Sequence, residues 1–286
     1  MRTETIIRVL TACSLAGLLF GVGLRLTGSQ IVTSVRRCRL GWIVVANFVV
    51  VPALALVMAR IFRLGAEVSV GMLLLAAAPF APVVPVFTRM ARADLALAAG
   101  LTTLFPVLSA VLTPWVCAVT LRGVPNAGSV RFGVGGVLLT LLGTIVVPLG
   151  LGIAMNRWAP GLARRVLRPM EIIAEFVGAV SLAFVTITEA RAVAAIGWEA
   201  LLAMTLVCEI SMVLGWTIGG PDQEMRRVVG LGTSNRNIAL ALLIAIQSFA
   251  GTPVVSAVVA NGLLLIFLGL LHVAFWRWTP ARRPNV

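Results

Sequence analysis

The stretch GLGTSNRN at residues 230–237 is a polar segment with two glycines that interrupts an apolar run from about 225 to 248. About 20 apolar residues are enough for a helix to cross the roughly 30 Å hydrocarbon layer of a bilayer. Lipid cannot hydrogen-bond the backbone groups that a break in such a helix exposes, so the break must face a cavity or another break. The stretch therefore predicts a discontinuous membrane helix.

A second apolar run, at about 68 to 89, contains the segment APFAPVVP at residues 78–85. Proline lacks a backbone donor and clashes with the preceding helical turn, so three prolines so close together predict a break here as well. Interrupted spans at corresponding positions in two halves of a chain are typical of inverted-repeat transporters, which bind substrate near the membrane midplane. We expect half-repeats at about 1–121 and 131–286, with four and five helices, whose third and eighth spans are broken and cross.

The rest of the chain has the composition of a membrane protein. Of its 286 residues, 60% are apolar and 12% are charged, against about 25% charged residues in soluble domains. We predict an all-α polytopic membrane protein of about nine transmembrane helices, forming a single transporter domain over residues 1–286. The expected spans are about 6–27, 39–61, 68–89, 94–120, 133–156, 170–190, 196–218, 225–248 and 253–276.

The net charge of +13 raises the question of a nucleic-acid partner. The arginines, however, stand singly or in pairs between apolar runs rather than along one solvated face, so the bilayer is the expected partner and nucleic acid is not. Seven arginines fall on the N-terminal side of the nine spans and fifteen on the other side. Because cytoplasmic loops collect positive charge, we expect a cytoplasmic (inner) membrane protein with its N-terminus outside and its C-terminus in the cytoplasm.

Arg236 is the one arginine left over from this count, and it falls inside the eighth span. An arginine at the bilayer centre costs at least about 2.5 to 3.5 kcal/mol, so it is rarely present without a partner. One hypothesis is that it holds a substrate carboxylate bidentately, or supplies a fixed positive charge where a cation would otherwise sit. The alternatives are an ion pair with Glu175 or Glu209, the carboxylates well inside spans, or a side chain that reaches the interface.

The polar residues around Arg236 can offer hydrogen-bonding groups to a ligand, or they can hydrogen-bond between helices to repair the break. The residues predicted to bind substrate are Thr233, Ser234, Asn235, Arg236 and Asn237, with Pro82 from the other break. Glu209 and Glu175 are also candidate proton carriers. For His272, the sole histidine, we expect a packing or interfacial role.

These same segments resemble the bile acid:sodium symporter family. GTSNRNIALA at residues 232–241 is similar to the G-T-x-Q-R-N-x-A-x-A run of many bacterial members. Residues 79–88 and 91–97, then Thr102, and the LTP at 112–114 follow the family's fourth and fifth helices. The resemblance implies two inverted five-helix repeats with crossed, unwound helices, here without the family's first helix.

The resemblance also implies sodium as the candidate coupling ion, with no other cofactor. The family supplies a glutamate in the second broken helix, where this chain has Gly230, and a Ser-Asn pair in the first, where it has Val84 and Pro85. Oxygen-bearing residues remain at a few of the implied ion-binding positions. They are Asn47, Thr102, Ser234 and Asn235.

The sequence thus predicts a secondary active transporter of a small organic anion that works by alternating access. Coupling to protons, or none at all, stays open beside sodium coupling, as does a non-transporting sensor or scaffold of the same fold. An enzyme is not expected, because the chain has one histidine, no H-E-x-x-H or G-x-S-x-G motif and no aspartate within a span. The substrate's identity and the oligomeric state do not follow from the sequence.

Overall fold

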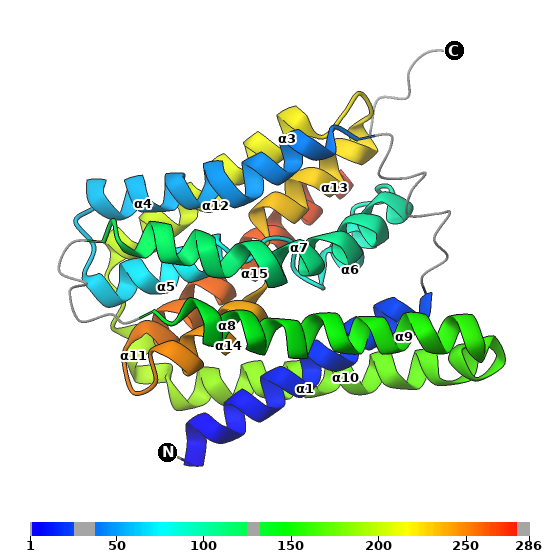
Figure 1. Ribbon diagram of the computed structural model, residues 1–286. Helices are drawn as coiled ribbons and strands as arrows, with labels where there is room; N and C mark the ends of the chain where they lie inside the picture. The colour runs from blue at the N-terminus through cyan, green and yellow to red at the C-terminus, as the bar shows by residue number, and fades with distance from the viewer. Residues whose placement is uncertain (1, 26–37, 125–131, 279–286) are drawn as a thin grey trace.

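The computed structural model describes residues 2–25, 38–124 and 132–278, and in these ranges it contains helices and no strands (Figure 1). The elements are α1 (Arg2–Arg25), α3 (Leu40–Val45), η1 (Ala46–Val50), α4 (Val51–Ile61), α5 (Ala66–Ala76), α6 (Val84–Met90), α7 (Leu95–Leu121), α8 (Val134–Leu141), η2 (Leu142–Val146), α9 (Val147–Trp158), α10 (Pro160–Thr188), α11 (Ala190–Ala194), α12 (Trp198–Ile218), α13 (Gln223–Ser234), α14 (Ile238–Ser248) and α15 (Val254–Trp278).

Eight helical stretches in the described part of the chain are long and apolar enough to cross a membrane. The shorter apolar helix α5 continues, after a break, into α6, and together they form the remaining predicted span. The prediction of an all-α polytopic membrane protein with about nine helices is confirmed. Both predicted breaks are present, between α5 and α6 and between α13 and α14.

The sixth span differs from its predicted start. We expected it to begin near residue 170, but α10 starts at Pro160, two residues after α9 ends at Trp158. Proline is well placed in the first turn of a helix, where its missing N–H has no helical partner. The exposed residues Arg164 and Arg165 therefore lie on a helical extension and not in a loop.

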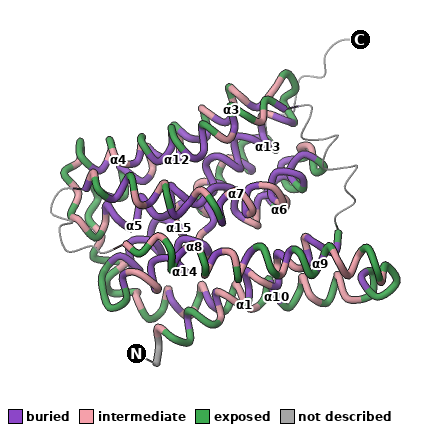
Figure 2. Tube along the Cα trace, viewed as in Figure 1, coloured by how far each residue is buried: buried purple, intermediate pink, exposed green. Residues whose placement is uncertain are grey.

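The helices form two groups that differ in burial. Helix α1 packs on α9 and α10 at one side of the molecule, and α12 with α13 and α5 with α15 form the other side (Figure 1). A Cβ on Gly23 of α1 would lie 2.9 Å from the Cα of Gly152 of α9, so these two helices approach closely at small residues. The apolar window of α10 is 17% buried, whereas that of the interrupted helix over Gln223–Ser248 is 89% buried (Figure 2).

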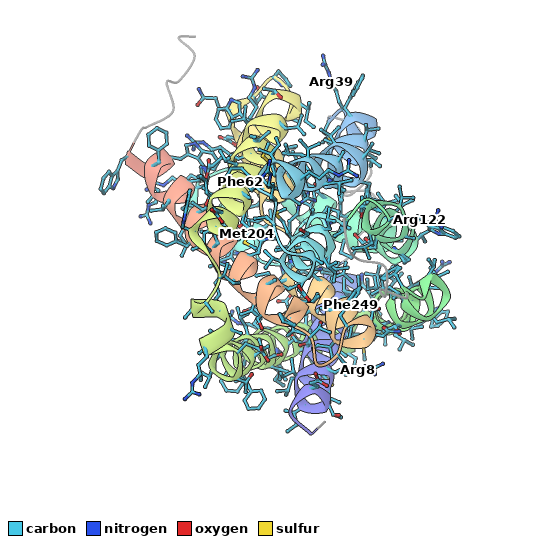
Figure 3. The ribbon with its side chains drawn as sticks, turned by 90° about the vertical axis from the view of Figure 1, so that its left-hand side faces the viewer. Arg8, Arg39, Phe62, Arg122, Met204 and Phe249 are labelled. Carbon is cyan, nitrogen blue, oxygen red and sulfur yellow. The ribbon has the colours of Figure 1, made fainter. Side chains whose placement is uncertain are left out.

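The start of α1 and the end of α15 lie at opposite ends of the bundle (Figure 1), as an odd number of crossings requires. Arg8 and Arg122, which the arginine count places on one side, are both exposed at the end that faces the viewer in Figure 3. Several other counted arginines lie outside the described residues. The interrupted helices α13 and α14 thus lie in the core of a bundle whose other helices surround them.

Candidate functional site

The two helix breaks are hydrogen-bonded to each other. The backbone N–H of Ala81, in the first break, donates to the carbonyl of Asn235 at 3.1 Å, and the N–H of Asn237 donates to the carbonyl of Ala78 at 2.8 Å. The hydroxyl of Thr113 on α7 donates to the carbonyl of Ala77 at 2.7 Å. Backbone groups that lipid could not satisfy are therefore satisfied by the facing break and by α7, as the sequence predicted for breaks at membrane depth.

Phe80 fixes how closely the breaks approach. It is fully buried, and its backbone has a φ of 57°, an uncommon conformation for a bulky residue. Its ring stacks on Phe105 at 4.1 Å between centroids and lies against Gly232, where a Cβ would be 2.0 Å from ring atom Cε1. Sequence reasoning missed this role of Phe80, although the glycine in the facing segment was a usable signal.

Asn47 reaches the second break from another helix. It lies in η1, a π-helical turn that ends two residues before Pro52. Proline at that position cannot donate to the carbonyl four residues earlier, which accounts for the widened turn. The Asn47 side chain donates to the carbonyl of Ile43 at 2.9 Å and to the hydroxyl of Thr233 at 3.2 Å. Its amide oxygen remains free to accept a further hydrogen bond.

Arg236 supplies that hydrogen bond. Its Nη1 donates to Oδ1 of Asn47 at 3.0 Å, and the residue is only 4% exposed. Its Nη2 has no hydrogen-bond partner among the described residues. The guanidinium lines a small cavity of about 10 Å³ with Ser211, Ser234 and Asn261, which is room for about one water molecule. The site therefore holds a buried positive charge whose Nη2 has no hydrogen-bond partner among the described residues.

The carboxylates named as ion-pair partners lie elsewhere. Oε2 of Glu209 is 3.0 Å from Nε2 of His272, and Glu175 is exposed on α10. In the described part of the chain Arg236 has no ion pair, and its burial excludes a side chain that reaches the interface. The ion-pair and interfacial alternatives for Arg236 thus have no support in the structure. His272 is a pairing residue as well as a packing one.

The remaining predicted residues divide between repair of the break and the space beside it. Asn237 caps α14, because its Oδ1 accepts from the N–H of Leu240 at 3.0 Å, and Asn235 donates to the carbonyl of Leu231 at 3.2 Å. Ser234 donates to the same carbonyl at 3.3 Å, and it also lines the Arg236 cavity.

Thr102 and Pro82 stand apart from this hydrogen-bonded group. Thr102 donates to the carbonyl of Ala98 within α7 at 2.7 Å, and no hydrogen bond among the described residues joins it to Asn47 or to the second break. Pro82 is half-buried in the first break. Ser211 and Asn261 were not predicted as site residues, although a polar residue inside an apolar span is a detectable signal for Asn261.

Residues 12–214 of the chain match the sodium bile acid symporter family. The chain is also 22% identical over 276 residues to the probable sodium/metabolite cotransporter BASS3, chloroplastic, of Arabidopsis thaliana, which covers 93% of the chain and 62% of that relative. A protein of the same name from Oryza sativa subsp. japonica is 21% identical over 93% of the chain and 63% of its own length. The chain therefore spans about three fifths of these relatives.

Proposed function

The chain belongs to the sodium bile acid symporter family, and from that premise we propose that it is a secondary transporter of a small organic anion bound beside Arg236. The observation that carries this proposal is the unused Nη2 of a guanidinium that is 96% buried and has no carboxylate partner among the described residues. A carboxylate satisfies a guanidinium in a fork geometry that a single neutral acceptor such as Asn47 cannot supply.

The backbone at the break also favours an anion. Helix α14 begins at Ile238, immediately after Arg236 and its capping residue Asn237. The N-terminus of a helix carries a partial positive charge, and discontinuous transporter helices direct such ends at anionic substrate groups. Ser211, Ser234 and Asn261 around the cavity can hydrogen-bond the rest of a small polar molecule.

Alternating access is part of the proposal. The present cavity beside Arg236 holds about one water, so a substrate requires the surrounding helices to move apart. Small residues line the packing surface between α1 and the pair α9 and α10, which does not include the interrupted helices. This surface is where we expect the helices to move. We propose that residues 1–121 and 131–286 act as inverted half-repeats, and that the paired breaks stay together while the packing around them changes.

Two coupling schemes have specific support. Sodium is the ion in the names of the plant relatives. The oxygen of Asn47 is, however, occupied by Arg236, so a sodium ion at that oxygen would meet a positive charge. The pair formed by Glu209 and His272 offers a proton-binding group on α12 and α15 and supports proton coupling as the second scheme.

The arginine distribution supports an orientation in the cytoplasmic membrane with the N-terminus outside and the C-terminus in the cytoplasm. Exposed Arg8 and Arg122 at one end of the bundle, and exposed Arg164 and Arg165 at the other, contribute to the count. The excess of arginine at the second end carries this assignment.

The test is uptake into liposomes that contain the purified protein, with labelled lactate, succinate and citrate as probes bearing one to three carboxylates. We expect uptake of at least one probe, stimulated by an inward gradient of sodium or of protons, and loss of that uptake in Arg236→Gln. Arg236→Lys is the matched control for this variant, because lysine keeps the positive charge but cannot bind a carboxylate through two parallel N–H groups. Binding without uptake would favour the sensor or scaffold, and uptake that is unchanged in Arg236→Gln would refute the anion site.

A further inference from the structure

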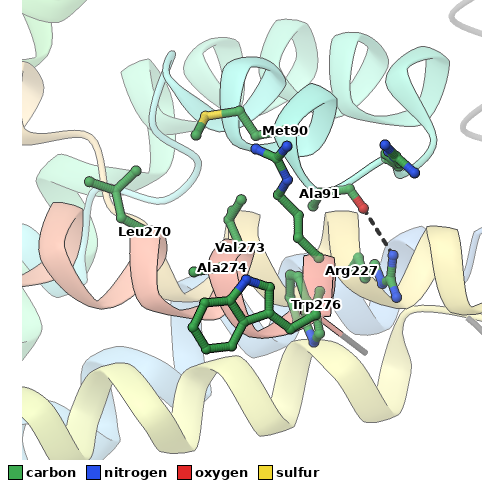
Figure 4. A pocket seen from close by; sticks show the side chains of 10 residues that line it. Met90, Ala91, Arg227, Leu270, Val273, Ala274 and Trp276 are labelled. Atoms are coloured by element: carbon green, nitrogen blue, oxygen red, sulfur yellow. Dashed lines mark hydrogen bonds between the residues drawn. The ribbon is translucent and has the colours of Figure 1, made fainter. Parts of the chain in front are cut away.

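A second cavity lies away from the paired breaks, near the start of α13. It has a volume of about 570 Å³, within the roughly 300–1,000 Å³ of typical small-molecule sites. Helices α13 and α15 and the end of α6 form its walls (Figure 4). Seven residues of α13, about 10 Å of helix, separate Arg227 in this cavity from Ser234, where the break begins.

Arg227 is the buried polar group of this cavity. It is 6% exposed, and its Nη1 donates to the carbonyl of Ala91 at 2.9 Å (Figure 4). Its guanidinium carbon lies 5.6 Å from the ring centroid of Trp276, which holds the planar group over the aromatic face. Its Nε has no hydrogen-bond partner among the described residues. The fixed guanidinium thus has a buried N–H group at Nε that can bind a ligand.

The other residues that line the cavity are either positively charged or apolar. Arg92 and Arg277 are exposed at its rim, and none of its described lining residues is acidic. Glu224, one turn earlier on α13, is exposed and close enough for its charge to act on Arg227, but it forms no ion pair within the described chain. Leu270 and Val273 from α15 supply an apolar wall, and Trp278 beyond them is 87% exposed.

We propose that this cavity binds a phosphate oxyanion, held by Arg227 from inside and by Arg92 and Arg277 from the rim. A phosphate presents several acceptor oxygens, and arginine is the side chain best suited to bind them in a fork. The group can come from an anionic phospholipid headgroup or from phosphate in solution. The exposed aromatic and aliphatic residues beside the rim favour the lipid, because its glycerol and acyl chains cover apolar surface. This site is independent of the transport site at Arg236.

The experiment measures thermal unfolding of the purified full chain in a neutral detergent at constant ionic strength. Short-chain phosphatidylglycerol is titrated in one arm, short-chain phosphatidylcholine in the second, and inorganic phosphate against chloride in the third. A ligand that binds only the folded state raises apparent stability by mass action. Stabilisation by phosphatidylglycerol alone assigns the site to a lipid headgroup, and stabilisation by inorganic phosphate assigns it to a soluble ion. No stabilisation in the first and third arms overturns the proposal.

Variants test whether the response comes from this cavity. Arg227→Gln removes the hydrogen bond to the carbonyl of Ala91 and can lower the folding stability by itself. The first variant is therefore the double substitution Arg92→Gln with Arg277→Gln, at two exposed residues. We expect each substitution to weaken the apparent affinity about two- to fivefold. The matched control is Arg164→Gln with Arg165→Gln, two exposed arginines on α10 at the same end of the bundle. An unchanged affinity in the test pair, or an equal loss in the control pair, overturns the site.

Discussion

Helix α13 and the break that follows it carry two buried arginines, Arg227 and Arg236, in different surroundings. Each donates one hydrogen bond to an oxygen and has a fully buried nitrogen without a partner in the described chain. Arg236 lies between two paired helix breaks beside a cavity of about 10 Å³, and Arg227 opens on a cavity of about 570 Å³ that contains two further arginines. The same side chain therefore serves two proposals, because the size and charge of the space beside it decide what can reach the unused donor.

The largest expected effect comes from disturbing the contact between Gly232 and Phe80, which packs the two breaks together around Arg236 and not around Arg227. In Gly232→Ala the new Cβ would meet the Phe80 ring at 2.0 Å, so the two breaks must separate. We expect a loss of about 1–3 kcal/mol or more in unfolding free energy, measured by thermal or denaturant unfolding. Gly150→Ala is the control, because nothing lies within 4 Å of a Cβ there, and helix propensity favours that change by about 1 kcal/mol. Equal stability of the two variants would contradict the close contact of the breaks.

The second effect separates the two arginines by function. Arg236→Gln removes the charge-assisted hydrogen bond to a carboxylate, worth about 1.5–3 kcal/mol, so we expect uptake to fall about ten- to a hundredfold. The unfolding temperature should not fall, because the substitution removes a buried charge that has no ion pair in the described chain. Arg227→Gln should lower uptake only in proportion to any loss of folded protein. If Arg227→Gln lowered uptake more than Arg236→Gln did, the transport site would lie at Arg227 and the present assignment would be wrong.

A third variant changes the partner of Arg236 and leaves the arginine in place. Asn47→Asp puts a carboxylate where the amide oxygen accepts from Nη1 at 3.0 Å. The substitution also loses the donation from the Asn47 amide nitrogen to the carbonyl of Ile43, so we expect the new ion pair to offset only part of the cost to folding. Uptake should fall about fivefold, since an internal anion then competes with the substrate. Asn47→Ala, compared by thermal unfolding, should instead lose about 1–3 kcal/mol, because it leaves buried donors without a partner. Faster uptake in Asn47→Asp would contradict the fixed-charge hypothesis.

The smallest effect concerns the aromatic ring beneath Arg227. Trp276 lies under its guanidinium and also stacks on Trp216, with 5.6 Å between the ring centroids. Trp276→Phe keeps a ring but weakens the cation–π contact, so we expect about 0.5–1 kcal/mol lower stability and a two- to fivefold weaker response to phosphatidylglycerol. Uptake through the site at Arg236 should stay unchanged. A loss of uptake would show that the two sites depend on each other.

Fold class and the positions of both breaks were predictable, because they depend on local chemistry. Apolar runs of membrane-spanning length, the prolines at 78–85 and the glycines at 230–237 act through the backbone near them. The start of α10 at Pro160 was mispredicted. Polar residues mark the end of an apolar stretch of sequence, but a helix can continue through them. Arg227 was counted only as a loop arginine, since its burial depends on Ala91 and Trp276 from two other helices.

The sequence by itself determined that this protein is a bundle of membrane helices with two interrupted spans and one arginine within the second interruption. Only the tertiary structure decided that the breaks hydrogen-bond to each other, that Asn47 and not Glu175 or Glu209 is the partner of Arg236, and that Glu209 pairs with His272. The physical reason is distance along the chain. Helix breaking follows from residues a few positions apart, whereas Asn47 and Arg236 are 189 positions apart and meet only when the helices pack.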